Sequence, residues 1–465
     1  MKKYDVIIIG AGPGGYVAAI RAAQLGFSTA IIEKRWLGGV CLNVGCIPSK
    51  ALLKNAEVAR TLREEAKDYG ITGDNISIDY AAAVKRSRRV SDRLTRGVSF
   101  LMKKHKIEVF EGTASIKTKN TIQVDLNNGE KEELKTSNII IATGAHPFIP
   151  PGWNYDGKTV LSYEDAILQD KLPESAVIIG GGAIGAEFAT IWSSFGTQIT
   201  IVEMLPNILP LEDEEISGEL QNSFKKRGIQ VFTEHKVEAI EPTENGVRVT
   251  VSNEDTKKEI EAEQALVAIG FKANTEKLGL ENIGVELDKR GFIQVDQNMA
   301  TSVPGVWAVG DVNGKLLLAH AASTMGIHCI ETIKGIKRDP IDFSMIPAAT
   351  YCYPQVASFG LTEKQSADEG KEVKVGRFPF QANGKSLGLG ESAGFVKVIV
   401  DTKYGEILGA HMIGPEVSEL LPELTLAHNA ELTIEDIAHN IHSHPTLSEA
   451  IMEAAEDALG HAIHI

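Results

Sequence analysis

Short apolar runs alternate with helical patterns along most of the chain. Residues 6–9 form a wholly apolar run, as expected of a strand that is buried on both faces of a parallel sheet. A helical pattern from Tyr16 to Leu25 and a second apolar run that ends at Glu33 follow it. The same order recurs at 177–203, where an apolar run precedes a helical pattern and another strand. This alternation predicts an α/β fold with two Rossmann-like domains.

Glycines at Rossmann spacing join the first strand to its helix. Gly10 permits a tight turn, Gly12 lets the backbone approach a pyrophosphate, and Gly15 lets the helix pack closely on the strand. Glu33 closes the second strand, where its carboxylate can accept hydrogen bonds from a ribose hydroxyl. The unit therefore indicates a dinucleotide site, and a glycine turn with a purely structural role is the alternative.

The second unit repeats this arrangement. Gly180, Gly182 and Gly185 follow its first strand, and Glu203 ends its second strand. The first glycine and the acid are 203 − 180 = 23 residues apart, as in the first unit (33 − 10 = 23). Two matched units imply two dinucleotides, and a flavin suits a nicotinamide partner because it converts a hydride into thiol chemistry. Glu203 would repel a 2′-phosphate and no Arg occupies 197–205, so NAD is expected rather than NADP.

Three later segments indicate how the chain is divided. A buried strand at 139–141 ends in a small-residue turn with Thr143 and Gly144, where a ligand can approach the backbone. We expect the run 265–271 to return the chain to the first domain. A later strand ends in the acid Asp311, for which a turn or cap role is the alternative. Beyond these, alternating strand patterns followed by helices predict a separate C-terminal domain.

Two cysteines stand five positions apart between glycines, just ahead of a helical pattern. Because Pro48 fits a helix best in its first turn, Cys46 is expected at a helix N-terminus, where free amides and the dipole favour a thiolate. Lys50 falls on the same face and adds a cation. A loop this small gains little entropy from closure, so Cys41 and Cys46 are predicted to form a redox disulfide rather than a structural bridge. Reduced cysteines packed as small apolar side chains are the alternative.

A histidine-containing segment lies near the C-terminus. Thr446 and Glu449 have the spacing of a capping box, so the simplest role of Glu449 is to cap the final helix. The catalytic alternative is that Pro445 fixes His444 in an extended conformation ahead of this helix, where a base has to be held.

Composition restricts the classes of partner. The chain has 465 residues and a formal charge of −15, which argues against a nucleic-acid or anionic-membrane surface. A basic cluster at 85–89, within a predicted helix at 80–104, is interpreted as a solvated helix face. No apolar run reaches about 18 residues, and the N-terminus passes directly into a strand, which leaves no room for a targeting segment. Four cysteines suit a reducing cytoplasm, with Cys329 and Cys352 expected in core or interface packing and no metal site.

On these motifs the whole chain resembles the flavoprotein pyridine nucleotide–disulphide oxidoreductases. The resemblance rests on both glycine motifs, the segment 41–50, Val309-Gly310-Asp311, and His444-Pro445-Thr446 with Glu449. It implies FAD and NAD as cofactors. It also implies an FAD-binding domain at 1–146 and 269–340, an NAD-binding domain at 147–268, and an α+β dimerisation domain at 341–465.

The resemblance also implies roles for individual residues. Cys41 would be the interchange thiol that meets the substrate, and Cys46 would face the flavin. In an obligate homodimer, His444 and Glu449 would reach the cysteines of the other subunit as a base and its orienting acid. Residues implied at the FAD site are Gly10, Gly12, Gly15, Glu33, Lys50, Ala114, Thr143, Gly144, Asp311 and Ala319. Those implied at the NAD site are Gly180, Gly182, Ile184, Gly185, Glu203, Val237, Ala268 and Gly270, while Glu187 would lie near Lys50 and the flavin.

The implied reaction oxidises protein-bound dihydrolipoamide to lipoamide and reduces NAD⁺ to NADH. The implied partners are lipoyl domains and the E2 acyltransferase core of 2-oxo acid dehydrogenase complexes, or the glycine cleavage H protein. The sequence leaves open which of these is served. A glutathione-reductase-like disulfide reductase is the alternative, although Glu203 argues against the NADP that such enzymes favour. A binding role with a structural flavin is a secondary alternative.

Overall fold

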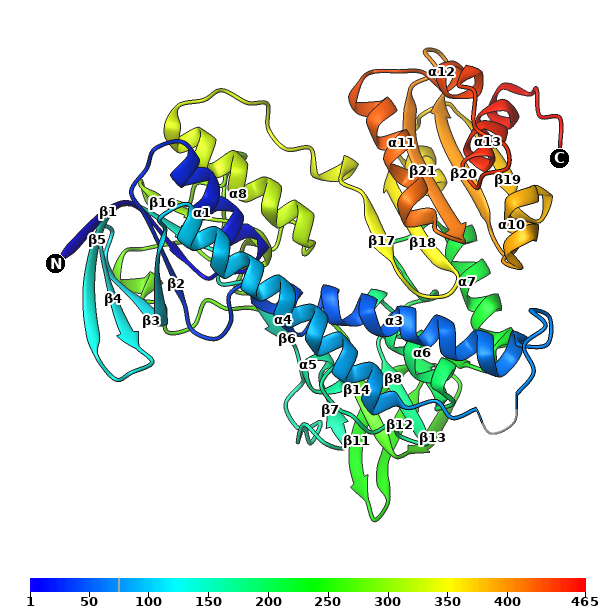
Figure 1. Ribbon diagram of the computed structural model, residues 1–465, viewed down its shortest axis with the longest axis horizontal. Helices are drawn as coiled ribbons and strands as arrows, with labels where there is room; N and C mark the ends of the chain where they lie inside the picture. The colour runs from blue at the N-terminus through cyan, green and yellow to red at the C-terminus, as the bar shows by residue number, and fades with distance from the viewer. Residues whose placement is uncertain (74–75) are drawn as a thin grey trace. The chain divides into compact units, whose positions relative to one another are not determined.

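The computed structural model describes residues 1–73 and 76–465, which form two compact units (Figure 1). The first unit consists of residues 1–51, 81–148 and 270–343. The second consists of residues 52–80, 149–269 and 344–465. The first glycine motif and the cysteine pair therefore belong to the first unit, and the second glycine motif and the C-terminal histidines belong to the second.

A largely parallel sheet forms the centre of the first unit. β1 (Lys2–Ile9) lies between β2 (Thr29–Glu33) and β5 (Lys131–Ile141) and runs parallel to both. Ile7 and Ile8 of β1 are fully buried, so both faces of this strand are covered, as its wholly apolar sequence predicts. The other strands of the sheet are β3 (Glu108–Thr118), β4 (Thr121–Leu126) and β16 (Val306–Ala308).

Two helices of the first unit pack against each other. α1 (Pro13–Gln24) follows the first glycine turn, and α8 (Ala319–Lys334) is its neighbour. A Cβ atom on Gly326 of α8 would lie 2.6 Å from the carbonyl oxygen of Gly14, so only glycine permits this approach. α1 begins three residues earlier than predicted because Pro13 is suited to the first helical turn.

The cysteine segment leads into helices. Cys41 lies in the short helix α2 (Gly39–Asn43), and Cys46 is the first residue of α3 (Cys46–Arg60). The prediction that Cys46 stands at a helix N-terminus is therefore confirmed. α3 continues as a π-helical turn, Thr61–Glu65, and the next long helix is α4 (Tyr80–Lys104).

The second unit contains a five-stranded parallel sheet in the order β10-β9-β8-β14-β7. Its central strand is β8 (Ser175–Ile179), and the second glycine turn leads from β8 into α6 (Ala183–Phe195). The other strands and helices are β7 (Val160–Leu161), β9 (Gln198–Val202), β10 (Gln230–Phe232), β14 (Gln264–Val267), α5 (Tyr163–Ala166) and α7 (Glu214–Lys226). A separate antiparallel sheet comprises β11 (Lys236–Thr243), β12 (Gly246–Ser252) and β13 (Lys257–Ala262).

Strand β14 corrects one expectation. The run 265–271 does not return the chain to the first domain as a whole, because Leu266 of β14 pairs with Ile178 of β8 in the second sheet. The return occurs one strand later: β15 (Phe271–Ala273) pairs antiparallel with β6 (Ala145–Pro147) in the first unit. The apolar pattern identified a strand but carried no information about its neighbour.

The C-terminal part of the second unit is an antiparallel sheet with helices. The strand order is β17-β18-β21-β20-β19, and α11 and α13 pack on this sheet. The strands are β17 (Ala348–Thr350), β18 (Gln355–Gly360), β19 (Val373–Pro379), β20 (Phe395–Asp401) and β21 (Ile407–Gly414). The helices are α9 (Glu363–Asp368), α10 (Gly384–Leu389), α11 (Val417–Asn429), α12 (Ile434–His439) and α13 (Glu449–Leu459). Short 3₁₀ turns lie at Leu280–Asn282, Gly310–Asn313, Phe343–Met345 and Phe380–Ala382.

A buried ion pair joins the two parts of the second unit. The Nζ atom of Lys397 on β20 lies 2.9 and 3.0 Å from the carboxylate oxygens of Asp213, which caps the N-terminus of α7. The same atom is 2.7 Å from Oε2 of Glu363. The side chain of Lys397 is 1% exposed, so its charge depends on these carboxylates for compensation.

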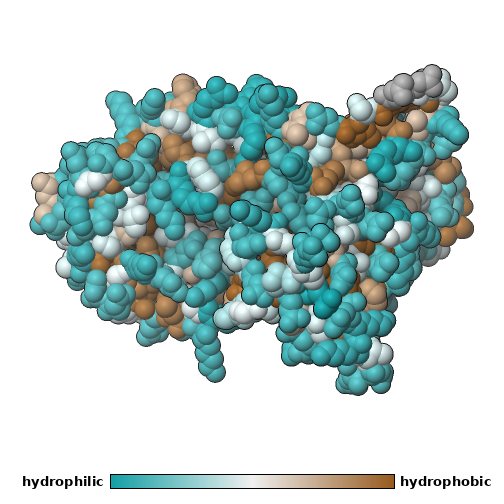
Figure 2. All heavy atoms as spheres, turned by 90° about the horizontal axis from the view of Figure 1, so that it is seen from below, coloured by the Kyte–Doolittle hydropathy of each residue, from teal (hydrophilic) through white to brown (hydrophobic). Residues whose placement is uncertain are grey.

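Hydrophilic residues cover most of the face drawn in Figure 2, with hydrophobic residues in small groups among them. Across residues 1–73 and 76–465, every helix is too short or too polar to cross a membrane.

Candidate active site

The first glycine turn combines two crowded positions with one open position. Gly10 has a φ angle of +103°, and a Cβ atom there would lie 2.3 Å from the carbonyl oxygen of Ala142. A Cβ atom on Gly15 would lie 1.9 Å from the carbonyl oxygen of Gly10. Gly12, in contrast, has no atom within 4 Å of its missing side chain. The turn is therefore closed towards the protein and open at the position where a pyrophosphate would approach.

The second glycine turn repeats this geometry. Gly180 also has a φ angle of +103°, and its Cβ atom would lie 2.3 Å from the carbonyl oxygen of Ala268. A Cβ atom on Gly185 would lie 2.0 Å from the carbonyl oxygen of Gly180, and Gly182 has open space beside it. The clearances in the two turns agree within 0.1 Å, which indicates the same type of ligand contact.

The acids at the ends of the second strands are held in the same way. Oε2 of Glu33 accepts a hydrogen bond from the backbone N–H of Ala11 at 2.7 Å, and Oε2 of Glu203 accepts one from Gly181 at 2.7 Å. The other carboxylate oxygen of each accepts a backbone N–H at 2.8 Å, two residues beyond the acid. Each carboxylate is therefore oriented before any ribose arrives.

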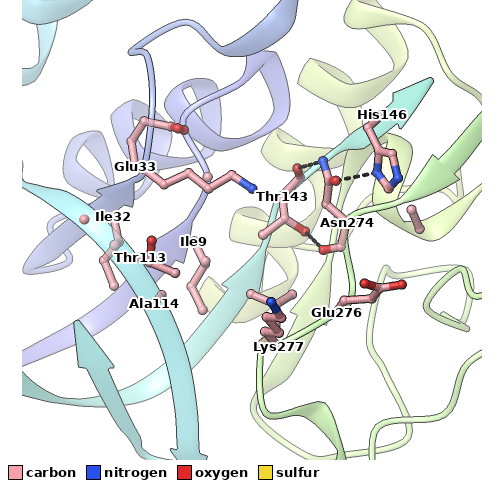
Figure 3. Close-up of a pocket in the computed structure, with 15 residues that line it drawn as sticks. Ile9, Ile32, Glu33, Thr113, Ala114, Thr143, His146, Asn274, Glu276 and Lys277 are labelled. Carbon is pink, nitrogen blue, oxygen red and sulfur yellow. Dashed lines mark hydrogen bonds between the residues drawn. The ribbon is translucent and has the colours of Figure 1, made fainter. Parts of the chain in front are cut away.

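A cavity of about 400 Å³ lies beside the first turn (Figure 3). Glu33 and Ala114 lie on one side of it, and Asn274, Glu276 and Lys277 on the other. The predicted FAD residues that line this cavity are Gly10, Glu33, Ala114 and Thr143. Gly12, Gly15, Lys50, Gly144, Asp311 and Ala319 lie outside its lining.

The far wall of the cavity contains residues that no sequence motif predicts. Asn274 donates a hydrogen bond from Nδ2 to the carbonyl oxygen of Thr143 at 2.9 Å, and Thr143 donates from Oγ1 to the carbonyl oxygen of Asn274 at 2.8 Å. The ring of His146 is held by Oδ1 of Asn274 at 2.8 Å. The pairing of β6 with β15 brings these residues together, and no local sequence signal indicates that pairing.

Asp311 lies in a 3₁₀ turn after β16 rather than at the end of the strand. Burial raises the pKa of its carboxyl group to about 6, and a backbone N–H only partly opposes this effect. Ala319 is the first residue of α8, and Gly144 has a φ angle of +69° in the turn after β5. Asp311 thus supplies a polar group whose charge is poorly compensated by the protein.

The cysteine thiols are close enough to form a hydrogen bond. Both are free thiols and are partly buried. The pKa of the Cys41 thiol is raised well above its usual value, first by the hydrogen bond with Cys46 and then by burial, while Lys50 acts in the opposite direction. Both effects favour the neutral thiol of Cys41 over its thiolate.

Helix α4 holds the end of the Cys41 helix. Nη2 of Arg88 donates a hydrogen bond to the carbonyl oxygen of Asn43, the last residue of α2. Nδ2 of Asn43 in turn donates to the carbonyl oxygen of Gly39 at 2.8 Å, and Oγ1 of Thr95 donates to Oδ1 of Asn43 at 3.4 Å. The basic cluster at 85–89 is therefore not only the solvated helix face that its sequence predicts, because Arg88 binds the end of α2.

The other predicted cofactor residues of the second unit lie on different elements. Ile184 and Glu187 are on α6, next to the glycine turn, and Val237 is on β11. Glu187 is buried, and its Oε1 accepts a hydrogen bond from the backbone N–H of Tyr351 at 3.1 Å. Gly270 has a φ angle of +127° in the segment after β14.

His444 and Glu449 form a pair at the start of α13. Nδ1 of His444 lies 2.9 Å from Oε1 of Glu449, and Oε2 of Glu449 accepts the backbone N–H of Thr446 at 2.7 Å. Glu449 therefore orients the imidazole, while the capping box suggested by the sequence is not formed, because Ser448 is the N-cap residue and α13 begins at Glu449 itself. Burial alone would raise the pKa of Glu449, but the Thr446 N–H and His444 lower it below its usual value.

The imidazole of His444 is available to a reactant. Its side chain is 78% exposed, and within the described residues its Nε2 atom has no hydrogen-bond partner. His442 differs, because its two ring nitrogens contact Oε1 of Glu423 and the carbonyl oxygen of Asn440 at 2.9 Å each. Within residues 1–73 and 76–465, no group of three or more His, Cys, Asp or Glu side chains is arranged to hold a metal.

Comparisons with known proteins place this geometry in a family. A model of the family described as pyridine nucleotide-disulphide oxidoreductase matches residues 4–326, and a model of its dimerisation domain matches residues 346–455. The second match indicates that the chain forms a homodimer.

Several proteins are similar to this chain over its whole length. Dihydrolipoyl dehydrogenase from Mycobacterium tuberculosis is 49% identical over 465 residues, with all of both chains covered. Dihydrolipoyl dehydrogenase from Bacillus subtilis is 44% identical, with 99% of both chains covered. Among solved structures, LpdA from Mycobacterium tuberculosis superimposes with a TM-score of 0.91 at 26% identity and covers 98% of this chain and 99% of its own. The HOCl-induced flavoprotein disulfide reductase RclA from Escherichia coli does so with a TM-score of 0.85 at 27% identity, covering 96% of this chain and 98% of its own. The two matched nucleotide turns, the cysteine pair and these full-length similarities together show that the chain belongs to the pyridine nucleotide-disulphide oxidoreductase family.

Proposed function

We propose that this chain is a dihydrolipoyl dehydrogenase, which oxidises dihydrolipoamide to lipoamide and reduces NAD⁺ to NADH. FAD and NAD(H) are its cofactors, in keeping with its family. The observation that carries the proposal is the cysteine pair at the start of α3, in a chain that also has two matched dinucleotide turns. Full-length relatives with 44–49% identity bear the same name, which supports the choice of substrate.

The residues present fit both cofactors. Gly12 and Gly182 leave the backbone open to a pyrophosphate, and the cavity beside Glu33 is large enough to hold part of a dinucleotide. We assign to FAD the residues Gly10, Gly12, Gly15, Glu33, Lys50, Ala114, Thr143, Gly144, Asp311 and Ala319. We assign to NAD the residues Gly180, Gly182, Ile184, Gly185, Glu203, Val237, Ala268 and Gly270, and we assign Glu187 to the surroundings of the flavin. Bound FAD would supply the acceptor for the electron pair of the reduced cysteines and the hydride donor to NAD⁺.

The functional domains follow from these assignments. Residues 1–146 and 269–340 bind FAD, residues 147–268 bind NAD, and residues 341–465 form the subunit interface. Glu203 supports NAD over NADP, because its buried carboxylate would lie close to a 2′-phosphate and repel it.

The first proton transfer uses His444. Because Nδ1 of its ring is held by Glu449, Nε2 is the atom that accepts a proton from a substrate thiol. An ordinary thiol has a pKa of about 8.5, so forming its thiolate at pH 7 costs roughly 2 kcal/mol, which a positioned imidazole offsets. Glu449 orients the ring and stabilises its protonated form.

Thiol–disulfide exchange then follows at Cys41. The substrate thiolate attacks Sγ of Cys41, which breaks the Cys41–Cys46 bond and releases Cys46 as a thiolate. The second substrate thiol attacks the mixed disulfide and forms lipoamide. Cys41 leaves with its electron pair and takes up the proton of this second thiol, as its raised pKa favours, and His444 then releases the first proton to water.

The proposed assembly places the two half-sites in different subunits. The partner subunit's His444 and the partner subunit's Glu449 would act on Cys41 of this chain, so the homodimer would be the catalytic unit. The dithiol would be delivered by lipoyl domains on the E2 core of a 2-oxo acid dehydrogenase complex, or by the H protein of glycine cleavage. A reducing cytoplasm is the proposed compartment. Four cysteines in a chain of this length do not form a framework of structural disulfides, and a disulfide that forms in the cytoplasm is usually catalytic.

The test mixes the purified holoprotein with dihydrolipoamide without oxygen and records the flavin spectrum. NAD⁺ or NADP⁺ is then added and nicotinamide reduction is followed at 340 nm, about the absorption maximum of NADH. A long-wavelength thiolate-to-flavin band followed by turnover selective for NAD⁺ is the expected result. A yellow protein that NADH reduces but dihydrolipoamide does not would exclude this substrate.

A further inference from the structure

Helix α4 carries a concentration of positive charge on an acidic chain. Its 25 residues include eight Lys or Arg and a single acid, Asp92, whereas the whole chain has a formal charge of −15. Val84, Val98 and Met102 of α4 are buried in the protein, whereas the exposed part of the helix carries most of its cations together with Leu94 and Phe100.

Most of these cations form one stripe. Lys85, Arg89, Arg93, Arg96 and Lys103 are exposed and spaced by three, four or seven residues, which places them on one face of the helix. Phe100 lies on the same face and is 64% exposed. We call these six residues the α4 stripe. At about 1.5 Å per residue, it extends roughly 27 Å along the helix axis.

The charges of the α4 stripe are not neutralised by the protein. Of its five cations, none forms an ion pair with a carboxylate in the part of the chain that the structure describes; Arg96 only donates from Nε to the carbonyl oxygen of Asp92 at 3.2 Å. Lys2, an exposed cation elsewhere in the first unit, is paired with Glu108. An unpaired cationic stripe with a large exposed aromatic side chain resembles a protein-binding surface more than a solvated helix face.

The helix that bears the stripe also contacts the redox segment. Arg88 and Thr95, on a neighbouring face of α4, both bond to Asn43, which closes the Cys41 helix. Arg86 donates from Nη1 to the carbonyl oxygen of Ala51 at 3.0 Å, within the helix that Cys46 begins. A partner bound to the stripe is therefore held beside the segment that performs thiol exchange.

We propose that the α4 stripe docks an acidic protein domain that carries the dithiol substrate. This inference rests on the proposed function, since it names how the substrate of that reaction is delivered. An acidic carrier is repelled by most of a chain with a charge of −15 and attracted at the stripe, so it approaches in one orientation. The Debye length of about 8 Å at physiological salt confines this attraction to the neighbourhood of α4.

Two other polyanions fit the stripe less well. A nucleic acid would experience the same overall repulsion and would gain nothing from a position beside the cysteines. A membrane-bound amphipathic helix needs a free apolar face, and the apolar face of α4 is packed in the protein core. Only a carrier of the dithiol accounts for both the charge and the location of the stripe.

The experiment compares two double variants of equal charge change. Arg93→Glu with Arg96→Glu reverses the stripe, and Lys117→Glu with Lys119→Glu reverses two exposed cations of the same unit near the β3–β4 turn. The holoprotein of each is assayed with free dihydrolipoamide and with a purified, reduced lipoyl domain of net negative charge, at low and high salt. Binding of the fluorescently labelled, oxidised domain is measured by anisotropy, which does not depend on turnover.

The stripe variant should lower kcat/KM for the domain by about tenfold or more and weaken its binding equally, while the control changes each less than twofold. Activity with free dihydrolipoamide should stay within twofold for both. Equal effects of the two variants, or an equal loss with free substrate, would overturn the docking proposal. The docking proposal would also be overturned if the stripe variant bound the lipoyl domain as the wild type does but no longer bound DNA or phosphatidylglycerol vesicles. Failure of the wild type to oxidise free dihydrolipoamide would instead overturn the proposed function, and the anisotropy result would still decide the docking.

Discussion

The second glycine turn allows a contact with ligand to be separated from a contact within the fold. Gly182→Ala adds a methyl group to open space at a backbone φ of −72° and ψ of −172°, which any residue adopts. Gly185→Ala places its methyl group 2.0 Å from the carbonyl oxygen of Gly180, well inside van der Waals contact. The two substitutions are chemically identical and only three residues apart, but the structure predicts opposite consequences.

The magnitudes follow from these clearances. Gly182→Ala should leave the free energy of unfolding unchanged or raise it by about 0.4–1 kcal/mol, because alanine restricts the unfolded chain. The methyl group stands where the pyrophosphate approaches, so we expect the loss of one charge-assisted hydrogen bond, about 1.5–3 kcal/mol, or roughly a 10- to 150-fold rise in KM for NAD⁺. Gly185→Ala must move α6 away from β8 by about 1 Å, which costs roughly 3 kcal/mol or more of stability.

Steady-state kinetics with dihydrolipoamide in excess gives KM for NAD⁺, and thermal unfolding monitored by circular dichroism gives stability. Gly218→Ala in α7 is the matched control, because its new methyl group also meets open space but lies on a helix outside the turn. It should leave KM unchanged. A Gly182→Ala protein with the KM of the wild type would refute the reasoning, as would a Gly185→Ala protein with an unaltered melting temperature.

Three other substitutions test the remaining parts of the molecule. His444→Gln should lower dithiol turnover by about 10²- to 10⁴-fold while FAD stays bound, as measured by flavin absorbance, and undiminished turnover would remove His444 from the mechanism. Glu449→Gln should be less stable than the wild type at neutral pH; because the folded pKa of Glu449 is lowered, this difference is present above about pH 4.3 and disappears as pH falls through the folded pKa, which urea unfolding across pH would show or contradict. Lys397→Met should cost about 3–5 kcal/mol in urea unfolding because it leaves the Asp213 carboxylate buried without a cation, whereas the exposed Lys374→Met should cost under 0.5 kcal/mol; similar values for both would contradict the buried ion pair.

Features set by local chemistry could be predicted from the sequence. The sign of φ at Gly10 and the crowding at Gly15 follow from glycine spacing between a strand and a helix. The start of α3 at Cys46 follows from Pro48, which tolerates only the first turn of a helix. In each case the constraint acts within a few residues, so the sequence pattern contains it.

Features set by pairing between distant segments could not be predicted. The run 265–271 is as apolar as the strand at 139–141. The strand at 139–141 pairs with β1 in the first unit, whereas β14 pairs with β8 in the second unit. Asn274 and His146 meet across a pairing of β6 and β15 that joins segments more than 120 residues apart. Apolar periodicity specifies that a strand is buried, but the neighbour of that strand depends on the packing of the whole domain.

The roles of surface residues, such as the basic residues of α4, could not be predicted from the sequence either. The basic residues of α4 have the spacing of any solvated helix, and only the structure shows that Arg88 reaches Asn43 while the exposed cations lack carboxylate partners. The sequence shows which charged residues could form ion pairs, but only the structure shows which ion pairs are formed.

The equal clearances of the two glycine turns have a consequence for inhibition. FAD and NAD⁺ share an adenosine diphosphate half, and in the proposed assignment Gly12 with Glu33 and Gly182 with Glu203 would contact that half. Neither turn can therefore distinguish one cofactor from the other, and selectivity has to reside in the segments that meet the flavin or the nicotinamide. Free ADP is a fragment that both turns accept, so it would compete with NAD⁺ during turnover and with FAD during reconstitution of the apoprotein, which links catalysis and cofactor loading to the adenylate pool.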